Sequence, residues 1–254
     1  MNLTPAFYEV LQPTAPKERM TALEKKCAIR MENITKRFGS KVIANKDVNL
    51  DLYEGEILSL LGENGSGKTT LMNMLSGIYF PDEGQIYVHD QPVTIASPKD
   101  AFDLGIGMIH QHFKLVDIFT ATENIILGLE GKLDLNSARQ KVKDICHKYG
   151  FDIDPDMKIY DMSVSQKQTV EIVKVLYRGA DILILDEPTA VLTPQEIDEL
   201  MAIMKNLTAE GKSILFISHK LNEIMSVADR VTVLRKGKYI GTVNTKDTNK
   251  QELS

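Results

Sequence analysis

The residues best suited to chemistry lie in one short stretch, Leu60–Leu71, which reads LLGENGSGKTTL. It matches the P-loop pattern, in which glycines precede a lysine and then a serine or threonine at fixed spacing. Glycines let backbone N–H groups close around phosphate oxygens, because no inward side chain blocks the approach. Lys68 would bring a mobile positive charge to the outer phosphates, and Thr69 a hydroxyl to Mg²⁺. The predicted phosphate-binding residues are Gly62, Glu63, Asn64, Gly65, Ser66, Gly67, Lys68, Thr69 and Thr70.

This loop needs a strand before it and a helix after it. Glu56–Leu61 is a short apolar run that predicts a buried strand. Thr69–Ser76 continues with helical spacing and stops at Gly77, a residue type that commonly ends helices. A helix that begins at the loop directs the positive end of its dipole toward a bound anion. The context therefore supports a nucleotide-phosphate site.

Three further apolar runs read as buried core strands that end in polar side chains. They are Ile106–Ile109 before Gln111, Ile182–Leu185 before Asp186 and Glu187, and Ser213–Ser218 before His219. Open α/β sheets bind their ligands at the carboxyl ends of the strands. We therefore expect these side chains to meet the P-loop at one edge of a sheet.

Each of these side chains has a chemical and a simpler interpretation. Gln111 could hold Mg²⁺ or a water beside the phosphate, or it could be a polar loop residue. Asp186 could hold Mg²⁺ through water, and Glu187 could orient or deprotonate an attacking water. Glu187 could also shape the site without touching that water. His219 could contact a γ-phosphate, although a lone histidine at a strand end is more often a packed loop residue.

Alternating apolar residues before the P-loop, around Ile29 to Met31 and Val48 to Leu52, predict half-exposed antiparallel strands. Phe38 lies between them and could either stack on an adenine ring or close a small core. Between the predicted core strands, Thr122–Gly128, Leu135–Tyr149 and Ser163–Arg178 have helical periodicity. The third of these begins with a capping box formed by Ser163 and Gln166, which taken alone marks only a helix start.

Composition sets the broad class. The chain has 254 residues, 43% of them hydrophobic and 26% charged, with a net charge of −5, and is long enough to bury a core. No apolar run approaches the about 18 residues that cross a bilayer, and the first part of the chain carries no apolar signal segment, so we expect a cytosolic chain. Cys27 and Cys146 are expected to be reduced thiols. The acidic charge argues against nucleic acid as the main partner.

The order of these features resembles the nucleotide-binding subunit of ABC transporters. The resemblance runs from about Ala28 to Val243 and rests on Phe38, the P-loop, Gln111, the helix start at Met162–Gln166, Asp186 with Glu187, and His219. Within that family, GIGMIHQHFKLVDIFTATENIILG, SVSQKQTVEIVKVLYRGADILILDEPTAVLTPQE and FISHKLNEI are similar to segments of bacterial importers for simple sugars and nucleosides. This branch includes importers served by basic membrane lipoproteins.

The resemblance implies the ABC ATPase fold, an α/β fold in which a RecA-like P-loop NTPase core carries an antiparallel β subdomain and an inserted α-helical subdomain. It implies a domain over 28–243, with the helical subdomain at about 113–178, after a flexible extension at 1–27 and before a polar tail or linker at 244–254. ATP and Mg²⁺ are the implied ligands, the metal being held by Thr69, Gln111 and Asp186. The implied catalytic residues are Glu187 as base, His219 as switch histidine, Gln111 as Q-loop residue, and Lys68.

Two departures from the family pattern stand out. The signature that usually reads Leu-Ser-Gly-Gly-Gln, or Leu-Ser-Val-Gly in this branch, has Met162, Val164 and Ser165 at its first, third and fourth positions. Ser163, Ser165 and Gln166 would contact, in trans, the ATP held by another module. If that position needs glycine for a positive φ, the Cβ of Ser165 would cost about 1–2 kcal/mol and crowd the phosphate. The chain also has about half the length usual for this branch, which indicates the first module of a tandem ATPase or a fragment of one.

The predicted function is ATP binding and hydrolysis that power an ABC importer of simple sugars or nucleosides. The expected partners are membrane-spanning permease subunits, a second ABC module and, indirectly, an extracytoplasmic solute-binding lipoprotein, at the cytoplasmic face of the membrane. Two alternatives stay open. One is a non-transport ABC ATPase that acts on ribosomes or DNA, and the other is a regulatory module that binds nucleotide without hydrolysis.

Overall fold

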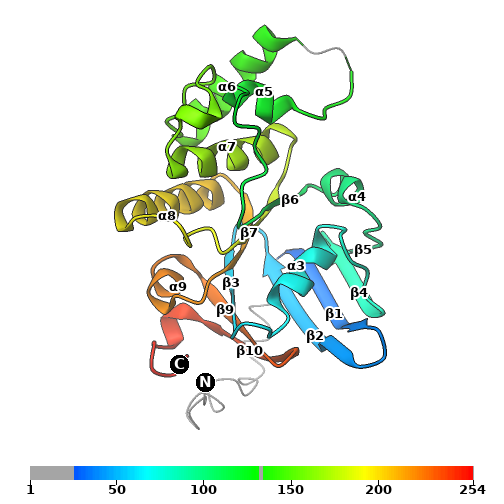
Figure 1. Cartoon of the computed structure of the whole chain (residues 1–254). Helices are drawn as coiled ribbons and strands as arrows, with labels where there is room; N and C mark the ends of the chain where they lie inside the picture. Colours follow the sequence, from blue (N-terminus) through cyan, green and yellow to red (C-terminus); the bar gives the residue numbers. More distant parts are fainter. Residues whose placement is uncertain (1–25, 132–133, 254) are drawn as a thin grey trace.

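The computed structural model describes residues 26–131 and 134–253. The predicted flexible extension at 1–27 therefore lies almost wholly outside the described residues. Two sheets form the lower half of the molecule in Figure 1, and the helices within residues 121–177 rise above them. No α-helix within the described ranges is long and apolar enough to cross a membrane.

The larger sheet carries the strands predicted to be buried. Its order is β10-β9-β3-β8-β7-β6, in which β9, β3, β8, β7 and β6 run parallel and β10 returns antiparallel to β9. The bounds are β3 Ile57–Leu61, β6 Ile106–Ile109, β7 Ile182–Asp186, β8 Ser213–Ile217, β9 Arg230–Arg235 and β10 Lys238–Asn244. Every residue of β3 and β8 is buried, as expected for parallel strands covered on both faces.

The smaller sheet is antiparallel and has the order β2-β1-β4-β5. Its strands are β1 Cys27–Phe38, β2 Val42–Tyr53, β4 Glu83–Val88 and β5 Gln91–Val93. Ile29, Met31, Leu50 and Leu52 are almost fully buried on one face and pack with the helix that follows the P-loop. The alternation in the sequence thus correctly predicted antiparallel strands with one buried face.

The helices begin largely where the sequence indicated. The bounds are α3 Lys68–Leu75, α4 Pro98–Asp103, α5 Ala121–Ile126, α6 Leu135–Tyr149, α7 Val164–Tyr177, α8 Pro194–Ala209 and α9 Leu221–Val227, with 3₁₀ turns at Ile159–Asp161 and Thr245–Asp247. Capping boxes start α5, α7 and α8, which satisfies backbone N–H groups that no intrahelical bond reaches. Between β6 and β7, α5, α6 and α7 pack on one another to form the helical insertion (Figure 1).

The end of the chain differs from the expected polar tail. Asn244 still belongs to β10 and pairs with Arg230, one residue beyond the predicted boundary. Leu253 is fully buried in the main core, and the Thr245 hydroxyl donates to the carbonyl of Ala228 at 2.6 Å. One apolar side chain among polar neighbours is a weak signal in sequence, but in the fold it covers apolar surface of the domain.

Gly107 of β6 lies where the core sheet packs closely against the helical insertion. A Cβ built on Gly107 would lie 2.7 Å from Cβ of Val175 in α7 and 3.0 Å from Cβ of Ala180. We predict that Gly107→Ala lowers the free energy of unfolding by about 1–3 kcal/mol through overpacking, measured by urea denaturation.

The matched control is the double variant Gly107→Ala/Val175→Ala. Val175→Ala removes Cγ1, which would lie 3.1 Å from the new Cβ, but keeps the nearer Cβ. The double variant should therefore lose somewhat less stability than the sum of the two single variants. Wild-type stability in Gly107→Ala alone would contradict the contact.

Candidate nucleotide-phosphate site

The P-loop curls around its own lysine. β3 ends at Leu61, and α3 begins at Lys68 after Gly67, which has φ 94° and ψ 5°. Lys68 is only 6% exposed, and its Nζ donates to the carbonyl oxygens of Gly62 at 2.7 Å and Glu63 at 2.9 Å. The ammonium group is thus held inside the loop, while Glu63, Asn64 and Gly65 remain exposed around it.

Two glycines of this loop, Gly62 and Gly67, lack room for a side chain for a reason other than the predicted access of phosphate to the backbone. A Cβ on Gly67 would lie 2.5 Å from both the carbonyl oxygen of Ala44 and Nδ2 of Asn45. At Gly62 it would lie 2.4 Å from Oγ of Ser66 and 2.5 Å from the carbonyl oxygen of Leu234. These two glycines therefore let the loop pack closely against β2 and β9. Only Gly65, with φ 79°, has nothing within 4 Å on its Cβ side.

The wall behind the loop contains residues that sequence reasoning missed. Asn45 on β2 is fully buried and donates from Nδ2 to the carbonyl of Gly67 at 3.2 Å. Gly237 donates its backbone N–H to the carbonyl of Ser66 at 3.2 Å. Neither Asn45 nor Gly237 was among the predicted site residues. No local signal marks either contact, since each joins residues distant in the chain.

The carboxyl ends of the core strands bring the predicted polar residues together. Nε2 of Gln111, after β6, lies 3.5 Å from Oε2 of Glu187, at the limit of a hydrogen bond. Nδ1 of His219, after β8, lies 3.4 Å from Oε1 of the same carboxylate. Glu187 therefore stands between the amide and the imidazole. Its φ of 46° is unusual for a residue with a side chain, and its N–H donates to the carbonyl of Ile217 at 3.1 Å.

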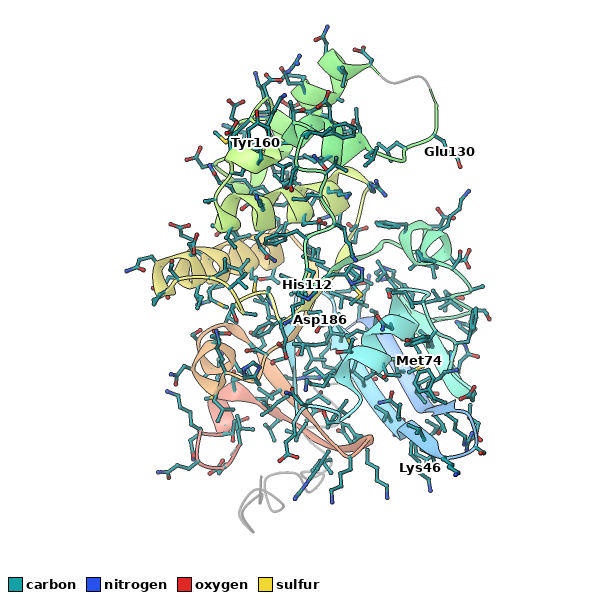
Figure 2. The ribbon with its side chains drawn as sticks, in the orientation of Figure 1. Lys46, Met74, His112, Glu130, Tyr160 and Asp186 are labelled. Carbon is teal, nitrogen blue, oxygen red and sulfur yellow. The ribbon has the colours of Figure 1, made fainter. Side chains whose placement is uncertain are left out.

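Lys68 and the two carboxylates after β7 share one electrostatic environment. Burial lowers the pKa of the Lys68 ammonium, while Glu187 and then Asp186 oppose that shift. Burial raises the pKa of Asp186, and the neighbouring Glu187 raises it further, whereas His110 and Lys68 act against the rise. Asp186 lies at the centre of the molecule, where the helical insertion meets the core (Figure 2). His110 was not among the predicted site residues.

These groups fit a nucleotide triphosphate and a hard divalent cation. Oγ of Ser66 is buried without a hydrogen-bond partner inside the loop, so it can donate to an anion there. The hydroxyl of Thr69, the amide of Gln111 and the carboxylate of Asp186 are oxygen donors of the kind that Mg²⁺ accepts. The open side of Gly65 gives phosphate oxygens access to the loop backbone.

Ser163–Gln166 form the start of α7 in the helical insertion. Ser163 and Gln166 form the predicted capping box, with distances of 3.2 Å from Gln166 N to Ser163 Oγ and 2.9 Å from Ser163 N to Gln166 Oε1. With Ser165 they line a cavity of about 650 Å³ beside Glu196 and Glu199 of α8. Among the described contacts none joins them to the P-loop of the same chain.

Ser165 does not carry the strain that the sequence suggested. It lies in the first turn of α7 and is absent from the residues with positive φ. A Cβ therefore costs no backbone strain here, because right-handed helical dihedrals suit every L-residue. Whether this side chain crowds a phosphate in trans stays a prediction.

Phe38 is the last residue of β1. Its ring is 39% exposed and meets the ring of Tyr79 edge to face, with centroids 5.2 Å apart. This partly exposed aromatic pair is compatible with both predicted roles, adenine stacking and closure of a small core. Its role stays a prediction.

Comparison with known proteins identifies the class. A family described as "ABC transporter" matches residues 45–190, more than half of the chain. The chain therefore belongs to the ABC transporter family. A solved structure described as cbiO1 from Clostridium perfringens, part of the ABC transporter complex cbiONQ, is similar with a TM-score of 0.78 and 28% identity, over 88% of this chain and 90% of that one. The predicted fold is thereby confirmed.

The curated relatives refine this similarity. The chain is 59% identical over 230 residues to the nucleoside import ATP-binding protein NupA of Lactococcus lactis, covering 89% of this chain and 45% of that protein. It is 58% identical to the guanosine import ATP-binding protein NupO of Bacillus subtilis, with the same coverage of both chains. It is 47% identical to a putative carbohydrate transport ATP-binding protein of Mycoplasma pneumoniae. The chain spans about half the length of the curated relatives it matches.

The two positive-φ glycines of the loop provide a matched test of the packing explanation. Gly65→Ala should lower the free energy of unfolding by about 1–2 kcal/mol, the cost of a left-handed conformation at a residue with a side chain. Gly67→Ala carries the same strain and also meets Ala44 and Asn45, so urea denaturation should reveal a larger loss. Equal losses in the two variants would contradict the close approach to β2.

Asp186 should reduce the stability of the nucleotide-free chain at neutral pH. Its pKa is raised in the folded state, so folding favours the protonated form and loses stability as the pH rises through that pKa. Asp186→Asn cannot ionise. Thermal unfolding should therefore give a higher Tm for the variant near neutral pH, and a difference that shrinks below the ordinary aspartate pKa of about 3.9. A wild type that is more stable at neutral pH would contradict this assignment.

Proposed function

We propose that this chain is an ATP-binding and ATP-hydrolysing module that powers an ABC importer of nucleosides or simple sugars. The observation that carries the proposal is the group around Glu187, where the Gln111 amide and the His219 imidazole flank one carboxylate near Lys68. Such an arrangement suits phosphoryl transfer to water, which needs anchored phosphates and an oriented base. Two of the similar proteins are named for the import of nucleosides or guanosine, and a third is named as a putative carbohydrate transport protein. These names support the proposed solute class.

In the proposed mechanism the P-loop amides and Lys68 bind the β- and γ-phosphates. Glu187 accepts the proton of the attacking water, and the side chains of Gln111 and His219 hold its carboxylate in place. His219 also lies where it can contact the γ-phosphate. A bound Mg²⁺, held by Thr69, Gln111 and Asp186, would neutralise phosphate charge. Adenine is proposed to lie near Phe38.

A second ABC module completes the proposed site. The signature residues Ser163, Ser165 and Gln166 are remote from the P-loop of their own chain, which supports a role in trans at a partner's nucleotide. The relatives' greater length supports a tandem arrangement in which this chain corresponds to one module. Permease subunits and an extracytoplasmic solute-binding lipoprotein are the further proposed partners, with the module at the cytoplasmic face of the membrane.

The alternatives can be separated experimentally. A non-transport ATPase would co-purify with ribosomes or DNA and not with membranes. A regulatory module would bind ATP but show no turnover when the second module is present. The helical backbone of Ser165 removes one motive for this second alternative, because no strain opposes a competent signature there. Uptake of a radiolabelled nucleoside by vesicles that contain the assembled transporter tests the proposal directly.

We predict that Glu187→Gln preserves ATP affinity and lowers turnover of the assembled transporter by about 100- to 10,000-fold, the range typical of a general base. Steady-state phosphate release measures the turnover, and equilibrium dialysis measures the affinity. Lys68→Met is the control that should lose affinity itself. Wild-type turnover in Glu187→Gln would remove Glu187 from the proposed role.

A further inference from the structure

The first attachment of the segment after Gln111 to the helical insertion is at Lys114. The backbone N–H of Lys114 donates to Oε1 of Glu171 at 2.7 Å, and Nζ of Lys174 donates to the backbone carbonyl of Lys114 at 3.2 Å. Glu171 and Lys174 stand one turn apart on the same face of α7. Two side chains of one helix thus bind both backbone polar groups of one loop residue.

The burial of Glu171 makes this contact unusual. Glu171 belongs to the buried face of α7 and is only 6% exposed. A buried carboxylate costs free energy unless it is paired and hydrogen-bonded. Lys174 and Arg178 supply the neighbouring positive charges. Burial lowers the pKa of each of these two side chains, and the Glu171 carboxylate opposes part of that shift. Arg178 itself donates to the carbonyl of Leu127 at 2.6 Å and so also fastens the end of α5.

A second attachment follows two residues later. Asn124 of α5 is fully buried, accepts the N–H of Val116 at 2.7 Å and donates to its carbonyl at 3.0 Å. Lys114 and Val116 are therefore both hydrogen-bonded to helices of the insertion. The chain between the end of β6 and the first attachment is only 110–113, and an extended chain from Gln111 to Lys114 spans at most about 10–11 Å. The attachment at Lys114 thus limits where the Gln111 amide can lie.

We propose that Glu171 and Lys174 are positioning residues that set the Gln111 amide against Glu187 by holding Lys114 to α7. The inference rests on the proposed function, because it acts through the proposed role of Gln111 at the Mg²⁺ site. It links that site to α7, the helix that begins with Ser163–Gln166. A purely structural bond would stabilise the insertion but leave the Mg²⁺ requirement of nucleotide binding unchanged.

The test measures how binding of a fluorescent ribose-labelled ATP to the whole chain depends on Mg²⁺ concentration. Gln111→Ala, Glu171→Met and Lys174→Met should each raise the Mg²⁺ concentration for half-maximal binding by about tenfold or more, the effect typical of losing support for a metal ligand. Glu171→Gln, which keeps an acceptor oxygen, should shift it less than Glu171→Met. Glu123→Met is the matched control, since it also removes a glutamate acceptor of a backbone N–H in the helical insertion, that of Thr120, at a residue outside 110–114.

The double variant Gln111→Ala/Glu171→Met separates positioning from other effects. If Glu171 acts through Gln111, the double variant should require no more Mg²⁺ than Gln111→Ala alone. Additive shifts, or an unchanged Mg²⁺ requirement in both Glu171→Met and Lys174→Met while Gln111→Ala shifts it, would overturn the inference and leave the proposed function intact. A wild-type chain that binds no Mg²⁺-ATP would overturn the proposed function and the inference with it.

Discussion

The close packing of the P-loop against β2 and the β9–β10 turn is the constraint on which the site depends. Gly67 can approach Ala44 and Asn45 only because it lacks a Cβ, and its positive φ turns the chain so that α3 begins at Lys68. The lysine then reaches back to carbonyls of its own loop. A flexible side chain is thereby fixed as a buried charge at a defined place, which is what a phosphate site requires.

The second condition is the parallel register of β6, β7 and β8, which ends three strands at the same edge. Polar residues that follow those strands gather there, and Glu187 takes a left-handed conformation to stand between Gln111 and His219. Such backbone conformations cost free energy of order 1–3 kcal/mol and persist where the surroundings enforce them. Here the enforcing contact is the bond from Glu187 N–H to Ile217 of β8.

The helical insertion packs against β6 and is hydrogen-bonded to the segment that follows it. Gly107 allows α7 to lie directly against β6, and Lys114 is bound by two side chains of that helix. The same helix begins with Ser163–Gln166, for which no described contact reaches the P-loop of this chain. The residues after β6 therefore link the proposed phosphate site on the core to the helical insertion.

Local patterns in the sequence determined the P-loop, the core strands and the helix start at Ser163, because these depend on periodicity, capping and loop chemistry within a few residues. They also identified Gln111, Asp186, Glu187 and His219, since polar residues directly follow apolar strands. Only the tertiary structure decided why Gly62 and Gly67 must be glycine, that Asn45 and Gly237 support the loop, that Ser165 is unstrained, and that Leu253 is buried. These features arise from contacts between residues far apart in the chain, on which no local pattern depends.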